Sequence, residues 1–408
     1  MNSNQHRRDF VRILGGAALA ASVPSAFVRA QGSESPIKFG WAISKTGPFA
    51  GGASSAQIPN YKLWVDDVNK AGGISVGGAK RRIEVVEYDD RSQPEEAVRA
   101  IERLVNQDKV DFLLPPWGTG MNLAVAPAFH KGNFPMIMPS CITDRMPELV
   151  KRWDNMFSLL GTASSYSDAL VAVMSKMRSE GKIGSKVAMV NVTDQFGLEL
   201  AAAARKSLKA AKFDIVLDSS YPITTQDMTP MIADAQRTNP DVFLGFSYPP
   251  DTIGLTDSAR VRGFNPKLFY VGVGTALPLY LGKFGPNVEG VMGPGGWNPD
   301  TEAIKTYIAR HKALNGQPPE EWVSLLCYSG LQALQQAIEK VGKIDRPAIV
   351  KTLASTTFDT VFGPLKFDNH ILAGGWTVGQ WQSGTFSAVA PNQKGAKAPI
   401  AKPAWKSA

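Results

Sequence analysis

The feature that most constrains the fold is a regular alternation of short apolar runs with amphipathic helical patterns along most of the chain. Such alternation predicts βαβ units and a parallel sheet with helices on both of its faces. The predicted strands are 37–44, 82–89, 111–114, 135–138, 186–191, 214–217, 241–246 and 267–271. The predicted helices between them are 59–71, 94–106, 122–131, 167–179, 197–210, 229–237 and 253–262.

The number of these elements requires more than one lobe. A chain of 408 residues exceeds what a single hydrophobic core comfortably holds, and the elements form two successive sets. Two further helices, 301–314 and 322–341, and strand-like runs at 362–367 and 375–380 follow the second set. These are too few for a third lobe. We therefore expect the chain to return to the earlier lobes and to cross between them more than once.

Residues 1–30 have the pattern of an export signal. Arg7 and Arg8 precede the apolar run 13–28, which is too short to span a membrane stably, and Ala30 ends a small-residue cleavage motif. The pattern Arg-Arg-x-Phe-x-Arg is typical of a twin-arginine signal and predicts export to the periplasm. An amphipathic N-terminal helix and an uncleaved anchor are the alternatives.

The net charge of +8 does not indicate a nucleic-acid partner. Residues 1–30 carry three of these positive charges, and the segment 391–408 carries four lysines and no acid. That segment is rich in Pro, Ala and Lys, which predicts a disordered basic tail. The body, residues 31–390, is then close to +1, so it has no basic face for nucleic acid to bind.

Residues that could support catalysis or bind a metal are scarce. Cys141 and Cys327 are expected to be free, buried thiols, with a disulfide as the alternative in an oxidising compartment. The four histidines lie far apart, so no local metal motif is present, and we expect no cofactor. The glycine-rich stretch 293–296 lacks the lysine and the following helix of a phosphate-binding loop. Because no nucleophile is recognisable together with a general base, the sequence predicts that the protein is not an enzyme.

Four segments carry a family resemblance. In chain order they resemble the S-x-T-G-P, D-x-N-x-x-G-G-I, Y-D-D-x-x-x-P-x-x-A and T-x-x-G-P-L-x-F-D motifs of the leucine-binding-protein family. They are residues 44–50, 67–74, 88–97 and 359–368. Each motif alone is weak, but the ordered set covers nearly all of 36–390. The chain thus resembles the type I periplasmic solute-binding proteins of ABC importers for branched-chain amino acids and related small acids.

The resemblance implies a fold and its boundaries. The expected fold is α/β and periplasmic-binding-protein-like, type I, with two doubly wound parallel-sheet lobes joined by three crossover segments. The crossings would lie near residues 158–161, 293–298 and 359–363. The expected division is 31–158 plus 298–360 for lobe one and 159–297 plus 361–390 for lobe two.

The expected ligand site lies between the lobes. The predicted strand 111–114 runs into a loop that opens a helix, and free N–H groups at a helix N-terminus suit a carboxylate. The resemblance implies a hydroxyl contact in that loop, further contacts after strand 135–138, and aromatic contacts from lobe two. The expected ligand-binding residues are Trp117, Gly118, Thr119, Ser140, Thr143, Phe196, Tyr248 and Trp297. Helix capping and core packing are the alternative roles for these side chains.

One departure from the family pattern bears on the ligand. Amino-acid binders of the family hold the ligand's ammonium with an acidic residue after the strand that matches 267–271, and residues 270–276 contain no acid. A buried ammonium without an anionic partner is costly. We therefore expect an aromatic or branched aliphatic acid, with an amino acid as the alternative. The expected protein is a monomer that delivers this ligand to the ABC permease; a sensory receptor of the same fold and, last, an enzyme are the other possibilities.

Overall fold

The computed structural model describes residues 35–297, 300–372, 374–375, 377–391, 393 and 395–406. All of them belong to one compact unit, Ser35–Ala408. The predicted export signal, 1–30, and Asn298 in the predicted second crossing lie outside the described residues. No helix of the described part is both long and apolar enough to cross a membrane.

The described part of the first lobe contains a three-stranded and a four-stranded sheet, besides the two-stranded sheets β2-β3 and β13-β14. In the three-stranded sheet, β1 lies between β4 and β5 and pairs in parallel with both. The four-stranded sheet has the order β15-β16-β7-β6, in which β6 and β7 are parallel. The strand bounds are β1 Ile37–Ile43, β2 Ile74–Val76, β3 Ala79–Arg81, β4 Ile83–Asp89, β5 Phe112–Leu114, β6 Met136–Met138, β7 Met156–Ser158, β13 Phe358–Thr360, β14 Gly363–Leu365, β15 Phe367–Asp368 and β16 Ile371–Leu372.

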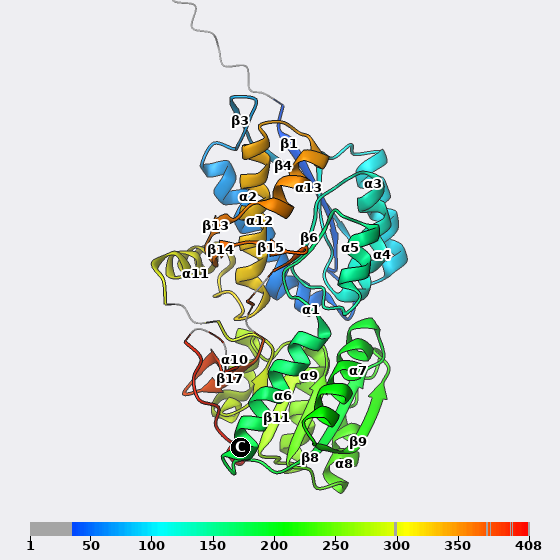
Figure 1. Cartoon of the computed structure of the whole chain (residues 1–408), viewed down its shortest axis with the longest axis vertical. Coiled ribbons are helices and arrows are strands. Elements are labelled where there is room, and N and C mark those ends of the chain that lie inside the picture. Colours follow the sequence, from blue (N-terminus) through cyan, green and yellow to red (C-terminus); the bar gives the residue numbers. More distant parts are fainter. Residues whose placement is uncertain are drawn as a thin grey trace, which may run out of the picture. The chain divides into compact units, whose positions relative to one another are not determined.

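The second lobe is built on a seven-stranded sheet of order β18-β17-β12-β11-β10-β8-β9. The strands from β9 to β12 are parallel neighbours, whereas β17 and β18 are antiparallel additions at one edge. Helices α6 and α7 lie beside this sheet (Figure 1). The strand bounds are β8 Lys186–Val192, β9 Asp214–Tyr221, β10 Val242–Phe246, β11 Leu268–Gly272, β12 Met292–Gly293, β17 Gly379–Gln382 and β18 Thr385–Ala388.

All nine predicted helices are present in the described part of the chain, and α1, α5, α10 and α13 are additional helices that were not predicted from the sequence. Figure 1 shows α12 beside α2, although the two are far apart in the sequence. The helices are α1 Ala50–Gly52, α2 Ile58–Lys70, α3 Pro94–Asn106, α4 Thr119–Lys131, α5 Met146–Arg152, α6 Ala163–Ser179, α7 Gln195–Ala210, α8 Thr229–Arg237, α9 Pro249–Val261, α10 Pro278–Phe284, α11 Glu302–Asn315, α12 Val323–Val341 and α13 Arg346–Ser355. Smaller elements are a π-helical turn Ala53–Gln57 and a 3-10 turn Gly285–Val288.

The predicted α/β fold with parallel-sheet lobes is confirmed, but the third crossing is displaced. It was expected at 359–363, with 361–390 in lobe two. In the structure Ile371 of β16 pairs with Ser158 of β7, so this part of the chain still belongs to the first lobe. After β12, the chain returns to the seven-stranded sheet only at Gly379. The boundary moves because β15 and β16 form a short antiparallel hairpin. This hairpin completes the four-stranded sheet of the first lobe before the chain leaves that lobe.

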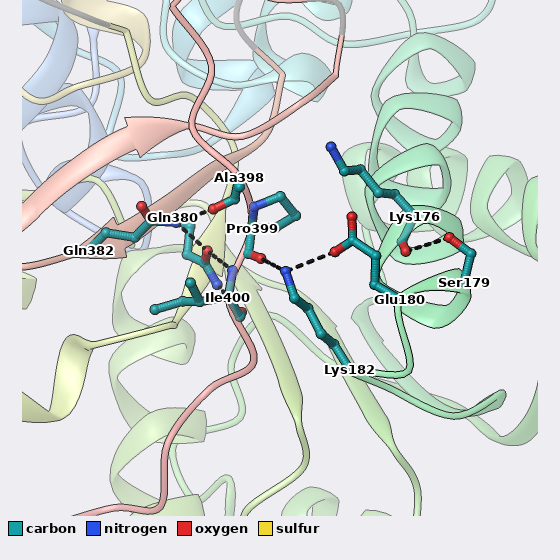
Figure 2. Close-up of polar contacts among 9 residues, drawn as sticks. All are labelled: Lys176, Ser179, Glu180, Lys182, Gln380, Gln382, Ala398, Pro399 and Ile400. Atoms are coloured by element: carbon teal, nitrogen blue, oxygen red, sulfur yellow. Dashed lines mark hydrogen bonds and ion pairs between the residues drawn. The ribbon is translucent and has the colours of Figure 1, made fainter.

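The expected disordered tail is instead ordered against the second lobe. Figure 2 shows the side-chain amide of Gln380 bonded twice to the backbone of Ile400: Nε2 donates to the carbonyl oxygen at 2.7 Å, and Oε1 accepts from the N–H at 2.9 Å. The Lys182 ammonium donates to the Pro399 carbonyl at 2.8 Å. The tail therefore satisfies its backbone groups on the lobe, and the prediction of disorder for 391–408 is wrong for the described tail residues.

Two side chains anchor the end of the tail. The Trp405 ring meets Phe269 edge-on at a centroid distance of 5.5 Å, and its indole N–H donates to the Phe264 carbonyl at 2.7 Å. Lys402 is 2% exposed, and its ammonium lies 3.3 Å from the centroid of the Trp405 ring. Composition alone predicts disorder because it ignores such tertiary partners, which here offset the entropy cost of ordering the segment.

Candidate ligand-binding site

Loops from both lobes surround a small cavity, and six of the eight predicted ligand-binding residues line it. Its volume is about 20 Å³, which is close to the room that one water molecule needs. The lining consists of Trp117, Gly118, Thr119, Ser140, Phe196 and Tyr248, together with Ile142, Leu160, Val273, Trp322 and Val323.

The N-terminus of α4 lies at this cavity. The helix begins at Thr119, and its N-cap residue, Gly118, supplies no side-chain cap. Gly118 has φ +101°, a left-handed conformation that glycine adopts without strain. The first N–H groups of a helix have no partner within it and carry partial positive charge. This end of α4 is therefore suited to an anionic group.

Two hydroxyls join the loops that form the first-lobe side of the cavity. Thr119 Oγ1 accepts from the N–H of Ile142 at 3.1 Å and donates to its carbonyl at 3.3 Å. Ser140 Oγ accepts from the N–H of Gly118 at 3.1 Å and donates to Gln57 Oε1 at 2.9 Å. Neither hydroxyl caps α4. Both hold the loop after β5 against the loop after β6, which sets the shape of the cavity wall.

Tyr248 is the centre of an aromatic cluster. Its ring lies 5.0 Å from Phe49, 5.5 Å from Trp117 and 5.3 Å from Phe196, measured between centroids. Its hydroxyl donates to the carboxylate of Asp194 at 2.6 Å. Burial raises the pKa of Asp194, and burial together with Asp194 raises the pKa of Tyr248. The phenol is thus held as a neutral donor, and its ring is fixed as a flat wall of the cavity.

The indole N–H of Trp117 is a buried donor without an acceptor. The residue is 3% exposed, and among the described residues Nε1 has no hydrogen-bond partner. Leaving such a donor unpaired costs about 1–3 kcal/mol. An acceptor group that reaches Nε1 would remove that cost.

The loop after β11 contributes an apolar wall. Val273 lines the cavity, and the residues that follow it are Gly274, Thr275 and Ala276. Among the described residues that line the cavity, none is an Asp, Glu, Lys, Arg or His. The described part of the chain also contains no group of three or more side chains that could hold a metal ion. The cavity therefore presents hydroxyls, N–H groups and apolar surface, without a formal charge.

Comparison with known proteins decides the family. Residues 36–385 match the family model described as periplasmic binding protein. The chain belongs to the periplasmic binding protein family. The family binds solutes and is not enzymatic, so this member is a binding protein rather than an enzyme, as the sequence predicts. Its fold is that of the type I members, and its similar proteins include Leu/Ile/Val-binding proteins.

Three similar proteins illustrate the family. The Leu/Ile/Val-binding protein of Escherichia coli is 26% identical over 365 residues, which cover 88% of this chain and 93% of that protein. A solute-binding protein of an ABC transporter from R. palustris, solved in complex with benzoate, has a TM-score of 0.74 at 20% identity, covering 90% of this chain and 99% of that one. A branched-chain amino acid binding protein from Streptococcus pneumoniae, solved with isoleucine, has a TM-score of 0.73 at 22% identity, covering 87% and 100%.

Two predicted residues of this periplasmic binding protein do not line the cavity. Thr143 is buried, and its hydroxyl accepts from the N–H of Arg145 at 3.1 Å, which is a local turn contact. Trp297 is buried with its ring 6.5 Å from Tyr307 of α11. The contact of Thr143 and Trp297 with a ligand stays a prediction.

Trp322 is a cavity residue that the sequence reasoning missed. It directly precedes α12, and its indole N–H donates to the Tyr166 hydroxyl at 2.9 Å. An aromatic residue at the start of a long apolar helix is equally compatible with the core, so no sequence signal pointed to the cavity. Glu320 and Glu321 precede it, and burial raises the pKa of these carboxyls to about 7 and about 8. Phe49, which follows the quoted S-x-T-G-P motif, does not line the cavity, but its ring contacts those of Trp117 and Tyr248.

Proposed function

We propose that this periplasmic binding protein captures a small carboxylate, aromatic or branched aliphatic, at the cavity lined by Trp117 and Tyr248. It acts as a monomer and delivers the ligand to the transmembrane subunits of an ABC importer. The observation that carries the proposal is the chemical character of the cavity. It offers the N-terminus of α4, and none of its described lining side chains is acidic; the indole N–H of Trp117, without a partner among the described residues, is a further donor.

A carboxylate has hydrogen-bond donors in this cavity, whereas the described lining residues offer no anionic side chain to an ammonium. The first-turn N–H groups of α4 and the Trp117 N–H are donors, which stabilise an anion. An ammonium would be desolvated beside apolar side chains such as Val273 without a compensating anion. Both kinds of ligand occur among similar proteins: the R. palustris protein was solved with benzoate and the S. pneumoniae protein with isoleucine.

Binding requires the site to open. A volume of about 20 Å³ cannot hold a benzoate-sized ligand. We infer that the rings of Trp117, Phe196 and Tyr248 separate when the lobes open, and that the closed arrangement forms again around the ligand. A ligand that contacts both walls only in the closed arrangement shifts the population toward it.

The decisive experiment compares leucine with 4-methylpentanoate, which has the same carbon skeleton and carboxylate but no ammonium. Titration calorimetry with the purified mature protein, with benzoate as a third ligand, measures each Kd. We expect 4-methylpentanoate or benzoate to bind and leucine to bind at least tenfold more weakly. Each ligand that binds should also raise the thermal unfolding midpoint. At a free ligand concentration of about a hundred times Kd, binding adds about 2.7 kcal/mol to the free energy of unfolding. Tight binding of leucine with no binding of the two acids would contradict the proposal.

Export by the twin-arginine route is part of the proposal. Replacing both Arg7→Lys and Arg8→Lys is expected to leave the protein in the cytoplasm, because the arginine pair is the recognised element of that signal. The single change Arg12→Lys is the matched control. Unchanged periplasmic yield of the double variant would point to a different export route.

A further inference from the structure

A second cavity adjoins the first and has a volume of about 460 Å³. Volumes of roughly 300–1,000 Å³ are typical of small-molecule sites. Tyr248 lines both cavities. The second cavity is lined by Pro48, Ile223, Thr224, Thr225, Gln226, Met228, Tyr248, Pro250 and Asp251.

Among the described residues that line this cavity, Asp251 has the only carboxyl. It lies in the first turn of α9, and the residue is 5% exposed. Its Oδ2 accepts from the Tyr221 hydroxyl at 3.3 Å and from the N–H of Tyr248 at 3.4 Å. Both donors are neutral, and both contacts are long for hydrogen bonds. Among the described residues, no lysine, arginine or histidine forms an ion pair with Asp251.

The rest of the lining suits the body of an organic ligand. Pro48, Pro250 and the Tyr248 ring present flat apolar faces, and Met228 adds a polarisable side chain that adapts to the shape of its neighbour. The hydroxyls and the amide of the loop between β9 and α8 provide further polar groups. A buried carboxyl at one side of an otherwise neutral cavity selects for a hydrogen-bond donor, because a charged acceptor gains about 1.5–3 kcal/mol from one.

We propose that this second cavity receives a hydrogen-bond-donating substituent of the ligand, a hydroxyl or an amine, which binds the carboxylate of Asp251. The inference rests on the proposed function, since the ligand's own carboxylate stays at the N-terminus of α4. The preferred ligand is then an elongated acid with a donor group at the end opposite to its carboxylate. Tyr248 lies between the two ends and contacts the ring or chain that joins them.

The test measures Kd for benzoate, 4-hydroxybenzoate and 4-(aminomethyl)benzoate with the full mature protein. We expect at least one of the two substituted acids to bind about tenfold more tightly than benzoate. If only 4-hydroxybenzoate gains affinity, Asp251 binds a hydroxyl. If only 4-(aminomethyl)benzoate gains affinity, Asp251 binds an ammonium, and if both gain, it binds hydrogen-bond donors in general. Equal affinity for all three acids would overturn the inference and leave the proposed function standing.

Asp251→Asn removes the charge while keeping the shape. We expect it to reduce the preference for the substituted acid at least fivefold and to change the Kd of benzoate by less than twofold. Asp227→Asn is the matched control, because Asp227 is exposed in the neighbouring loop and its described hydrogen bonds are to Thr229, away from Asp251. An unchanged preference in Asp251→Asn would contradict the assignment of this carboxyl.

A second variant covers the case in which Asp251→Asn does not fold. Gln226→Trp places a bulky side chain at the exposed rim of the second cavity and leaves α9 untouched. It should weaken the substituted acids while benzoate binds as before. If neither benzoate nor 4-methylpentanoate binds the wild-type protein, the proposed function fails and this inference fails with it.

Discussion

The indole ring of Trp117 lies directly on Gly52. A β-carbon built on residue 52 would be 2.2 Å from Cζ2 of that ring, far inside van der Waals contact. Gly52 ends the short helix α1, and Trp117 follows β5 and lines the cavity. The missing side chain at residue 52 therefore lets the ring occupy its place at the site.

Gly52→Ala should displace that ring. We expect the free energy of unfolding to fall by about 1–3 kcal/mol, as for other overpacked cores, and ligand affinity to fall with it. Gly51→Ala is the control, because its β-carbon would lie 3.7 Å from Pro249, an ordinary contact. Urea unfolding and ligand titration measure both effects; equal loss in the two variants would argue against the role of the Trp117 contact.

Trp117→Phe tests the unpaired indole N–H. If that donor binds the ligand carboxylate, its loss should raise the Kd of the bound acid about tenfold or more, since hydrogen bonds to charged groups contribute about 1.5–3 kcal/mol. Titration calorimetry gives the Kd, and thermal unfolding reports any loss of packing. Trp153→Phe, at a half-buried tryptophan outside the cavity lining, is the control. An unchanged Kd in Trp117→Phe would leave the N-terminus of α4 as the anion site.

Val273→Glu should redirect the ligand preference. It places an anionic side chain on the loop after β11, where Val273 lines the cavity. We expect the affinity for a simple carboxylate to fall at least tenfold through like-charge repulsion and leucine to gain affinity through its ammonium. Val273→Gln has the same length without the charge and should not favour leucine. Parallel behaviour of the two variants toward leucine would show that charge on this loop does not select the ligand.

The buried carboxyl of Glu321 should make stability depend on pH. Burial, with a smaller contribution from Glu320, raises the pKa of Glu321 to about 8, and among the described residues its Oε2 has no hydrogen-bond partner. Between about pH 4.5 and 8 the folded state then binds more protons than the unfolded state. Protonation of Glu321 therefore stabilises the folded state fully below about pH 4.5, and this stabilisation is lost as the pH rises to about 8.

Glu321→Gln should lessen this loss. Urea unfolding at pH 5.5 and 8.0 measures how far the free energy of unfolding falls between these pH values. We expect the fall in the variant to be smaller than in the wild type by on the order of 2 kcal/mol. Glu302→Gln, at an exposed residue paired with Lys305, should behave like the wild type. An identical pH dependence in all three proteins would show that Glu321 does not titrate in this window.

Trp405→Ala should loosen the C-terminal segment. The half-buried ring packs on Phe269, and its N–H is bonded to the Phe264 carbonyl, so we expect a loss of about 2 kcal/mol in the free energy of unfolding. Lys406→Ala is the control, because its described contact is from its backbone N–H to Asn287. Equal unfolding midpoints for the two variants would mean that the tail adds no stability.

Local pattern predicted the elements well and their ends less well. Helix α3 was predicted with its observed bounds, because Pro94 and the apolar period mark it clearly. Helix α9 begins at Pro249 rather than at the predicted residue 253, since proline fits the first turn of a helix, where no N–H partner is needed. Helix α4 begins at Thr119 rather than at 122. That shift matters, because it brings the helix N-terminus to the cavity.

The sequence by itself determined the alternation of strands and helices, and hence the α/β fold, because apolar periodicity is a local property of the chain. It also determined that the loop after β11 carries no acid. Only the tertiary structure decided which side chains meet: Trp322 reaches the cavity from a helix more than 200 residues beyond Trp117, and the basic tail packs on the second lobe. Contacts between distant segments depend on how the sheets bring them together, and no local pattern records that.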